Sequence, residues 1–150
     1  VQLQDVAAEG DGSYRIEATA LSRIRVLETD QSGEYLLGRI ESLIDSDSRV
    51  SPEVVQQTTE VFARYRSHLV EVFGSSPILE ALPRNPHYLS YVLASESLLT
   101  LPQRQALLEE PNAASRLLQL VGFLSGEMRA MLAIPSLPAT ELARTRWSPN

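Results

Sequence analysis

The sequence contains no lysine and no cysteine, although it has thirteen basic residues, all of them arginine. Without lysine the chain cannot form Schiff bases, Ser-Lys dyads or the phosphate-binding lysine of a P-loop. Without cysteine it has no disulfides, thiolate nucleophiles or thiolate metal sites. The absence of cysteine is compatible with a reducing compartment, so we expect a cytoplasmic location.

Long apolar runs and an excess of positive charge are also missing. No run of about 18 apolar residues occurs, and the opening VQLQDVAAEG lacks a basic region followed by an apolar one, so neither a membrane span nor a signal peptide is predicted. The net charge of -6 argues against nucleic acid or membrane as a partner. With 150 residues, 43% of them hydrophobic, the chain should fold as one domain or two packed subdomains.

Residues 1–44 alternate between apolar and polar positions, which is typical of strands. In SYRIEATA (13–20), Tyr14, Ile16 and Ala18 share one face, so we expect a half-buried strand that pairs with residues 1–8. The intervening GDGS (10–13) predicts a hairpin turn. RIRVLET (23–29) and YLLGRIESL (35–43) predict two more strands, with a bulge or a close backbone approach at Gly38. Four strands with so little apolar surface cannot close a barrel.

The pattern changes to helical after residue 50. Ser51 and Pro52 are a suitable N-cap and first helical residue, and an apolar stripe then recurs every three or four positions until Gly74. The stripe consists of Val54, Thr58, Val61, Tyr65, Leu69 and Val72, widened by Val55, Phe62 and Phe73.

Three further helices are predicted after a proline-rich connector, SSPILEALPR. They begin at Asn85-Pro86, near Pro102 and after Asn112. We expect the last helix to present Leu117, Val121, Leu124, Met128 and Leu132 on one side and to end before Pro135. The predicted organisation is therefore a strand-rich part over residues 1–50, a helical bundle over 51–134, and a strap or tail over 135–150.

No constellation of catalytic or metal-binding residues emerges. His68 and His87 lack partners at the spacing of a metal motif, and no glycine-rich phosphate loop or nucleophile turn occurs. Neighbouring carboxylates at 109–110, and the pair at 45 and 47, do not converge as an acid/base pair must, so we interpret them as solvated surface. We therefore predict no catalytic residue, no cofactor and no metal.

Three tyrosines are the candidates for partner contact. Tyr88 and Tyr91 lie three positions apart on one predicted helix, although this spacing is more often used for packing. Tyr35 is the first residue of the fourth predicted strand. Trp147 lies in the predicted tail.

The stretch LTLPQRQALLEEPNAASRLLQL (99–120) predicts a sharp corner between two helices. Leu107, Leu108, Leu117 and Leu120 should face neighbouring helices, while Glu109 and Arg116 are expected to brace the corner. An exposed ion pair between Arg104 and Glu109 would contribute only about 0 to 1 kcal/mol. We interpret the stretch as architecture and not as a reactive site.

The order of these segments resembles the N-terminal substrate-binding domain of Lon proteases and the stand-alone bacterial proteins built from that domain. ALSRIRV (20–26) is similar to the family's G-x-x-R-F-R-V, and EYLLGRIE (34–41) to its P-Y-L-x-A-x-V-E. The most specific similarity is to the pattern L-x-x-x-x-K-Q-x-L-L-E-x-x-D-x-x-x-R-L-x-x-L. From its K-Q onward the pattern is matched by Arg104, Gln105, Leu107, Leu108, Glu109, Asn112, Arg116, Leu117 and Leu120.

The resemblance covers residues 1–134 and implies an α+β fold, in which a partial PUA-like antiparallel β-barrel precedes a C-terminal α-helical bundle. The family's opening barrel segments, such as PLFPL, have no counterpart here, so we expect missing strands to belong to a longer protein or to another chain. Open sheet edges would otherwise invite self-association.

The function that the resemblance implies is non-enzymatic binding of unfolded or exposed apolar protein segments. Two alternatives stay open: an oligomerisation or scaffold module that packs through its helices against a partner subunit, and, with the least support, an enzyme.

Overall fold

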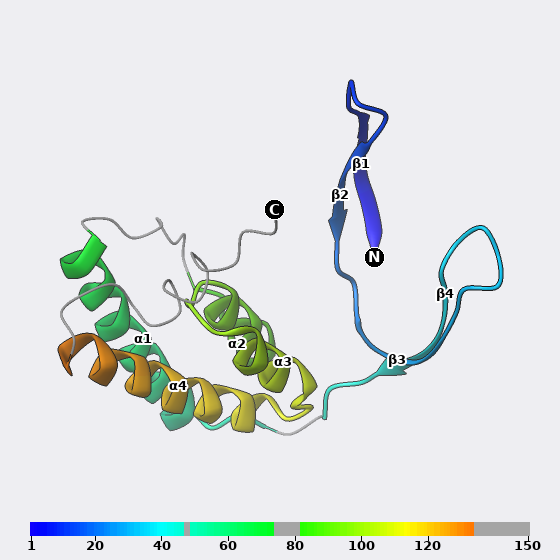
Figure 1. Ribbon diagram of the computed structural model, residues 1–150. Coiled ribbons are helices and arrows are strands. Elements are labelled where there is room, and N and C mark those ends of the chain that lie inside the picture. The colour runs from blue at the N-terminus through cyan, green and yellow to red at the C-terminus, as the bar shows by residue number, and fades with distance from the viewer. Residues whose placement is uncertain (47–48, 74–81, 134–150) are drawn as a thin grey trace. The chain divides into compact units, whose positions relative to one another are not determined.

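The computed structural model describes residues 1–46, 49–73 and 82–133, except for the side chains of Val72 and Phe73. It divides into two compact units, Val1–Ile44 and Asp45–Asn150, here called the hairpin unit and the helical unit (Figure 1). The expected α+β class is confirmed, with four strands followed by four helices in the described residues. The predicted helix end at Gly74, most of the proline-rich connector, the tail and Trp147 lie outside these residues.

The first hairpin joins β1 (Gln2–Ala8) and β2 (Tyr14–Thr19) in antiparallel register. Its turn lies where GDGS predicted it. Gly12 has a φ of 88°, which strongly favours glycine. The Asp11 carboxylate accepts hydrogen bonds from the Ser13 hydroxyl (2.6 Å) and backbone N–H (2.9 Å), and these bonds lower the pKa of Asp11. The Asp11 contribution to turn stability is therefore lost as the pH falls through that lowered pKa.

A bulge in β1 gives this hairpin an apolar face. The register shifts between Leu3 and Asp5, so Leu3 and Val6, three positions apart, both lie opposite apolar residues of β2. Leu3 pairs with Ala18 and Val6 with Ile16, on the same face. Simple alternation would have placed Leu3 and Val6 on opposite faces.

The second hairpin joins β3 (Arg23–Asp30) and β4 (Leu37–Leu43). The predicted bulge at Gly38 is wrong, because the register shifts on β3, between Val26 and Glu28. A Cβ at Gly38 would meet the nearest atoms at 3.9 Å, which is ordinary contact distance, so this glycine permits no unusually close approach.

The apolar faces of both hairpins are exposed, which contradicts the prediction of half-buried strands. None of residues 1–44 is buried, and Tyr14, Ile16 and Val26 are 67%, 58% and 55% exposed. The physical reason is that each sheet has only two strands, which leaves no second layer within a sheet to cover its apolar face.

The helical unit consists of α1 (Pro52–Phe73), α2 (Pro86–Ser95), α3 (Leu101–Glu109) and α4 (Ala113–Ala133). Side chains cap the N-termini of all four helices. Ser51, Asn85 and Asn112 accept hydrogen bonds from first-turn backbone N–H groups. At the start of α3, Thr100 and Gln103 form a capping box, in which the side chain of each residue accepts a hydrogen bond from the backbone N–H of the other.

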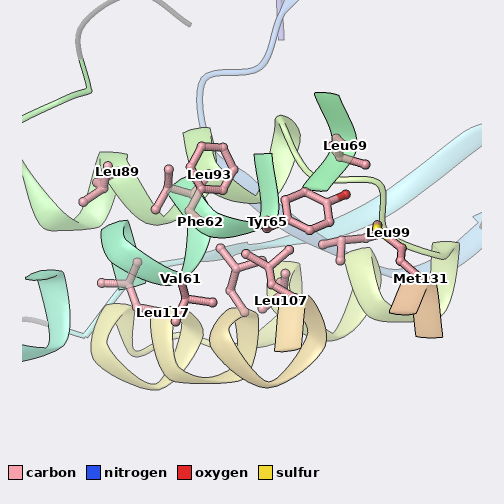
Figure 2. Close-up of a cluster of buried hydrophobic side chains, with 12 residues drawn as sticks. Val61, Phe62, Tyr65, Leu69, Leu89, Leu93, Leu99, Leu107, Leu117 and Met131 are labelled. Carbon is pink, nitrogen blue, oxygen red and sulfur yellow. The ribbon is translucent and has the colours of Figure 1, made fainter. Parts of the chain in front are cut away.

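The core lies between these helices, with α1 running alongside α4 (Figures 1 and 2). The predicted stripe on α1 is buried at Thr58, Val61, Tyr65 and Leu69. On α4 the prediction for Leu132 is wrong, since Leu132 is 70% exposed and Met131 is buried instead. The stripe reaches Met131 by a step of three from Met128, which keeps it facing the core. The buried cluster comprises Val61, Phe62, Tyr65, Leu69, Leu89, Leu93, Leu99, Leu107, Leu117, Leu120, Leu124 and Met131.

The Tyr65 hydroxyl gives a first test of this packing. Tyr65 is fully buried, and its oxygen accepts a hydrogen bond from the Leu98 backbone N–H at 2.9 Å. Tyr65→Phe leaves that donor unsatisfied and should lower the free energy of unfolding by about 1 to 2 kcal/mol. Urea denaturation followed by circular dichroism measures the change. Tyr88→Phe, at a 62% exposed position, is the matched control and should change stability little; equal effects would contradict this role for Tyr65.

Candidate functional site

A buried arginine organises the corner between α3 and α4. Arg116, in the first turn of α4, is 1% exposed, and its guanidinium donates four hydrogen bonds. Nε bonds the Leu107 carbonyl at 3.2 Å, and Nη1 bonds the Ser90 hydroxyl at 2.7 Å. Nη2 bonds the Asp45 carboxylate at 3.0 Å and the Glu110 carbonyl at 2.7 Å. One side chain therefore ties together α2, the end of α3 and the first residue of the helical unit.

Tyr91 closes the same network. Its ring lies 4.0 Å from the Arg116 guanidinium carbon, in a cation–π contact, and its hydroxyl is 3.1 Å from both carboxylate oxygens of Asp45. The interpretation of Asp45 as solvated surface is therefore wrong, since its side chain is 25% exposed and binds Tyr91 and Arg116. Asp47, which was considered together with Asp45 in the sequence, lies outside the described residues.

The acidic residues at the corner have different roles from those expected. Arg116 does brace the corner, but it bonds the Glu110 carbonyl and not the Glu109 carboxylate. Glu109 instead accepts a hydrogen bond from Gln105 at 2.7 Å, one turn earlier. The Glu110 carboxylate accepts from the Asn112 backbone N–H at 2.8 Å and so helps to form the turn between the helices.

A pocket of about 210 Å³ opens beside this network. Side chains from three helices line it: Tyr91, Ala94, Ser95, Arg104, Leu107, Leu108 and Arg116. The pocket is smaller than the roughly 300 to 1,000 Å³ typical of drug-sized ligands, so it suits a single side chain. Its walls are mainly carbon, with two guanidinium groups as the charged elements.

The two arginines of the pocket differ in the hydrogen bonds that their guanidinium groups make. Arg116 is buried, and its guanidinium donates four hydrogen bonds. Arg104 is exposed, and among the described residues its guanidinium makes one long hydrogen bond, 3.4 Å from Nη2 to the Ser97 carbonyl, and pairs with no carboxylate. The pocket wall therefore carries two positive charges: that of Arg116 is held in place by its hydrogen bonds, and that of Arg104 is accessible to an anionic group.

Of the three tyrosines predicted for partner contact, one lines the pocket. Tyr91 does so, Tyr88 is 62% exposed on the same helix, and Tyr35 is 76% exposed in the hairpin unit. Sequence reasoning missed Ala94 and Ser95. Their helical spacing could have indicated them, because Ala94 lies three positions after Tyr91 and Ser95 four, so both share the helix face of Tyr91.

The histidines do not contribute to the pocket lining. His68 Nδ1 lies 3.3 Å from the Glu71 carboxylate on the surface of α1, and the backbone N–H of His87 bonds the Asn85 cap. Across residues 1–46, 49–73 and 82–133, no three His, Asp or Glu side chains gather where they could hold a metal ion. A search of the same residues finds no helix with the length and apolar character needed to span a bilayer.

Residues 1–126, which include the whole pocket, match the family model described as the ATP-dependent protease La (LON) substrate-binding domain. The chain belongs to this family. The Lon-type resemblance of the strand motifs and the helix corner is thereby confirmed.

Two curated Lon proteases are similar to the Lon-type domain described here. Lon protease 1 of Herpetosiphon aurantiacus is 27% identical over 133 residues, covering 81% of this chain and 15% of that protein. Lon protease 2 of Syntrophobacter fumaroxidans is 23% identical over 127 residues, covering 82% of this chain and 16% of that protein. The chain thus spans about a sixth of the length of these relatives.

A solved structure shares the fold. The crystal structure of a Lon N-terminal domain protein from Xanthomonas campestris superposes with a TM-score of 0.56 at 22% identity, covering 81% of this chain and 63% of that one. The α+β architecture of strands followed by a helical bundle is therefore that of a Lon N-terminal domain. The helical unit and the hairpin unit in the described residues contain no closed barrel.

Proposed function

We propose that this chain is a non-enzymatic recognition module that binds unfolded or exposed apolar segments of other proteins. The observation that carries the proposal is the apolar pocket between α2, α3 and α4, sized for one side chain. Membership of a substrate-binding domain family supports the same function. The net charge of -6 favours protein partners over nucleic acid or membrane. A cytoplasmic location stays a prediction.

The Arg116 network supports this function because it makes the pocket rigid. Tyr91 and Leu107 line the pocket, and both are fixed through Arg116, by ring stacking and by a carbonyl hydrogen bond respectively. A preorganised wall lowers the entropy cost of binding, since fewer side chains must be immobilised when a partner enters.

The polar groups of the pocket are better suited to binding than to catalysis. Arginine cannot act as a general base near neutral pH, because its pKa is far above 7. The Ser95 hydroxyl donates to the Val92 carbonyl of its own helix at 2.8 Å, and the Tyr91 hydroxyl is held by Asp45. The carbonyl that holds Ser95 is not a base, and the carboxylate that holds Tyr91 is already paired with the guanidinium of Arg116, which reduces its ability to accept a proton.

A titration tests the proposal directly. A fluorescein-labelled polypeptide is presented once in an unfolded form and once folded, and anisotropy is measured against increasing concentrations of the full chain. We expect saturable binding of the unfolded form and little binding of the folded form. Absence of saturable binding, with the chain shown to be folded by circular dichroism, would contradict the proposal.

A second function, oligomerisation, is favoured by a different observation, which concerns the hairpins and not the helices through which a scaffold module was expected to pack. None of residues 1–44 is buried, and both hairpins present apolar faces and unpaired strand edges. Sedimentation velocity over a tenfold concentration range separates this function from the first. A strict monomer would argue against it, whereas a stable oligomer that binds no unfolded polypeptide would favour it.

A further inference from the structure

The exposed guanidinium of Arg104 distinguishes the pocket from a plain apolar patch. Among the described residues it has no carboxylate partner, and its single hydrogen bond, to the Ser97 carbonyl, is long at 3.4 Å. Glu109, the only carboxylate of α3, instead accepts a hydrogen bond from Gln105. On a chain with a net charge of -6, a local cation in the wall of an apolar pocket selects for an anionic group on whatever enters.

The size of the pocket limits where that anionic group can lie. About 210 Å³ admits roughly one side chain, and Arg104 itself lines this space. The anion must therefore belong to the residue that enters the pocket or lie directly beside it. In an extended peptide, adjacent side chains point to opposite sides and the next one on the same side is about 7 Å away. The α-carboxylate of a C-terminal residue is attached to the same Cα as the inserted side chain. It can therefore lie beside the pocket without the change of side or the spacing that separates neighbouring side chains.

We propose that the pocket captures the C-terminal residue of a polypeptide, with its apolar side chain between Ala94, Leu107 and Leu108 and its α-carboxylate on Arg104. This inference rests on the proposed function and specifies the substrate class for it: chains that end in an apolar residue. Tyr91 and Arg116 form the fixed floor, and Arg104 is the specificity-determining residue. Capture of a terminal carboxylate by preplaced donors is a recurrent mode of peptide recognition.

Two forms of one labelled peptide test the inference. The probe is a fluorescein-labelled octapeptide of polar residues that ends in leucine, made as the free acid and as the C-terminal amide. Anisotropy titrations against the full chain should give a dissociation constant about tenfold lower for the acid, because charge-assisted hydrogen bonds are about twice as strong as neutral ones. A free-acid peptide ending in serine should bind more weakly than the leucine peptide.

Variants of Arg104 separate recognition of the carboxylate charge from nonspecific apolar binding. Arg104→Gln should weaken binding of the acid to the level of the amide and leave the amide unchanged, while Arg104→Lys should retain part of the preference. Arg64→Gln, at an exposed position on α1, is the matched control and should alter neither affinity. Circular dichroism verifies that each variant is folded.

The outcomes are distinct. Equal binding of acid and amide by the unmodified chain, or a preference that survives in Arg104→Gln, would overturn the inference. If either occurs while a long unfolded polypeptide still binds saturably, the proposed recognition function stands and only the C-terminal specificity fails. If no unfolded polypeptide binds either, both fail.

Discussion

Asp45→Ala should lower the free energy of unfolding of the helical unit by about 2 to 3 kcal/mol, although Asp45 belongs to no helix. The substitution leaves the guanidinium of Arg116, which is 1% exposed, without its counter-ion. Removing one partner of a buried ion pair typically costs about 3 to 5 kcal/mol, because the remaining charge stays desolvated. We expect a value below that range, since three other hydrogen bonds to Arg116 remain and Asp45 is 25% exposed. Urea denaturation followed at the helical circular dichroism band measures the loss.

The matched control for Asp45 is an exposed carboxylate in the same unit. Glu71 lies 3.3 Å from His68 on α1, with its side chain 73% exposed, and pairs of this kind contribute about 0 to 1 kcal/mol. Glu71→Ala should therefore change stability far less than Asp45→Ala. Similar losses from the two substitutions would mean that the Arg116 network contributes little to the fold.

Leu117→Ala should be at least as destabilising, by about 3 kcal/mol. Leu117 is fully buried on α4, in the same hydrophobic cluster as Val61 of α1 (Figure 2). Truncation removes buried apolar contacts and leaves a cavity that the surrounding helices fill only in part.

The neighbouring residue supplies the control for this substitution. Leu118 is 46% exposed, so Leu118→Ala removes the same atoms from a position where water already has access, and should cost less than about 1 kcal/mol. Thermal unfolding of the two variants in parallel gives the comparison. A larger effect at Leu118 than at Leu117 would contradict the described orientation of α4.

The helices and the first turn could be predicted because their signals are local. Caps at Ser51, Asn85 and Asn112 and the stripe on α1 involve residues within a few positions of one another, and GDGS requires only a glycine at positive φ. The bulges on β1 and β3 could not be predicted, since they depend on which residue of the partner strand lies opposite.

The pocket and the Arg116 hydrogen-bond network could not be predicted either, because they join residues that lie far apart in the sequence. Asp45 and Arg116 are 71 positions apart, and nothing in the spacing of either residue indicates that they meet. Alternation in the strands predicted which side chains share a face but not whether anything covers that face. Only the helix corner at 101–120 was specific enough to indicate the family before the fold was known.

Polypeptide binding by a variant with a filled pocket tests the central claim most directly. Ala94 lines the pocket, and Ala94→Trp should occupy most of its volume without adding charge. Ala63→Trp places the same ring at an exposed position of α1 and controls for nonspecific apolar contact. Anisotropy titration with a labelled unfolded polypeptide should show binding weakened at least about tenfold by Ala94→Trp and unchanged by Ala63→Trp, a difference of about 1.4 kcal/mol. Unchanged binding by a folded Ala94→Trp variant would show that the pocket is not the recognition site.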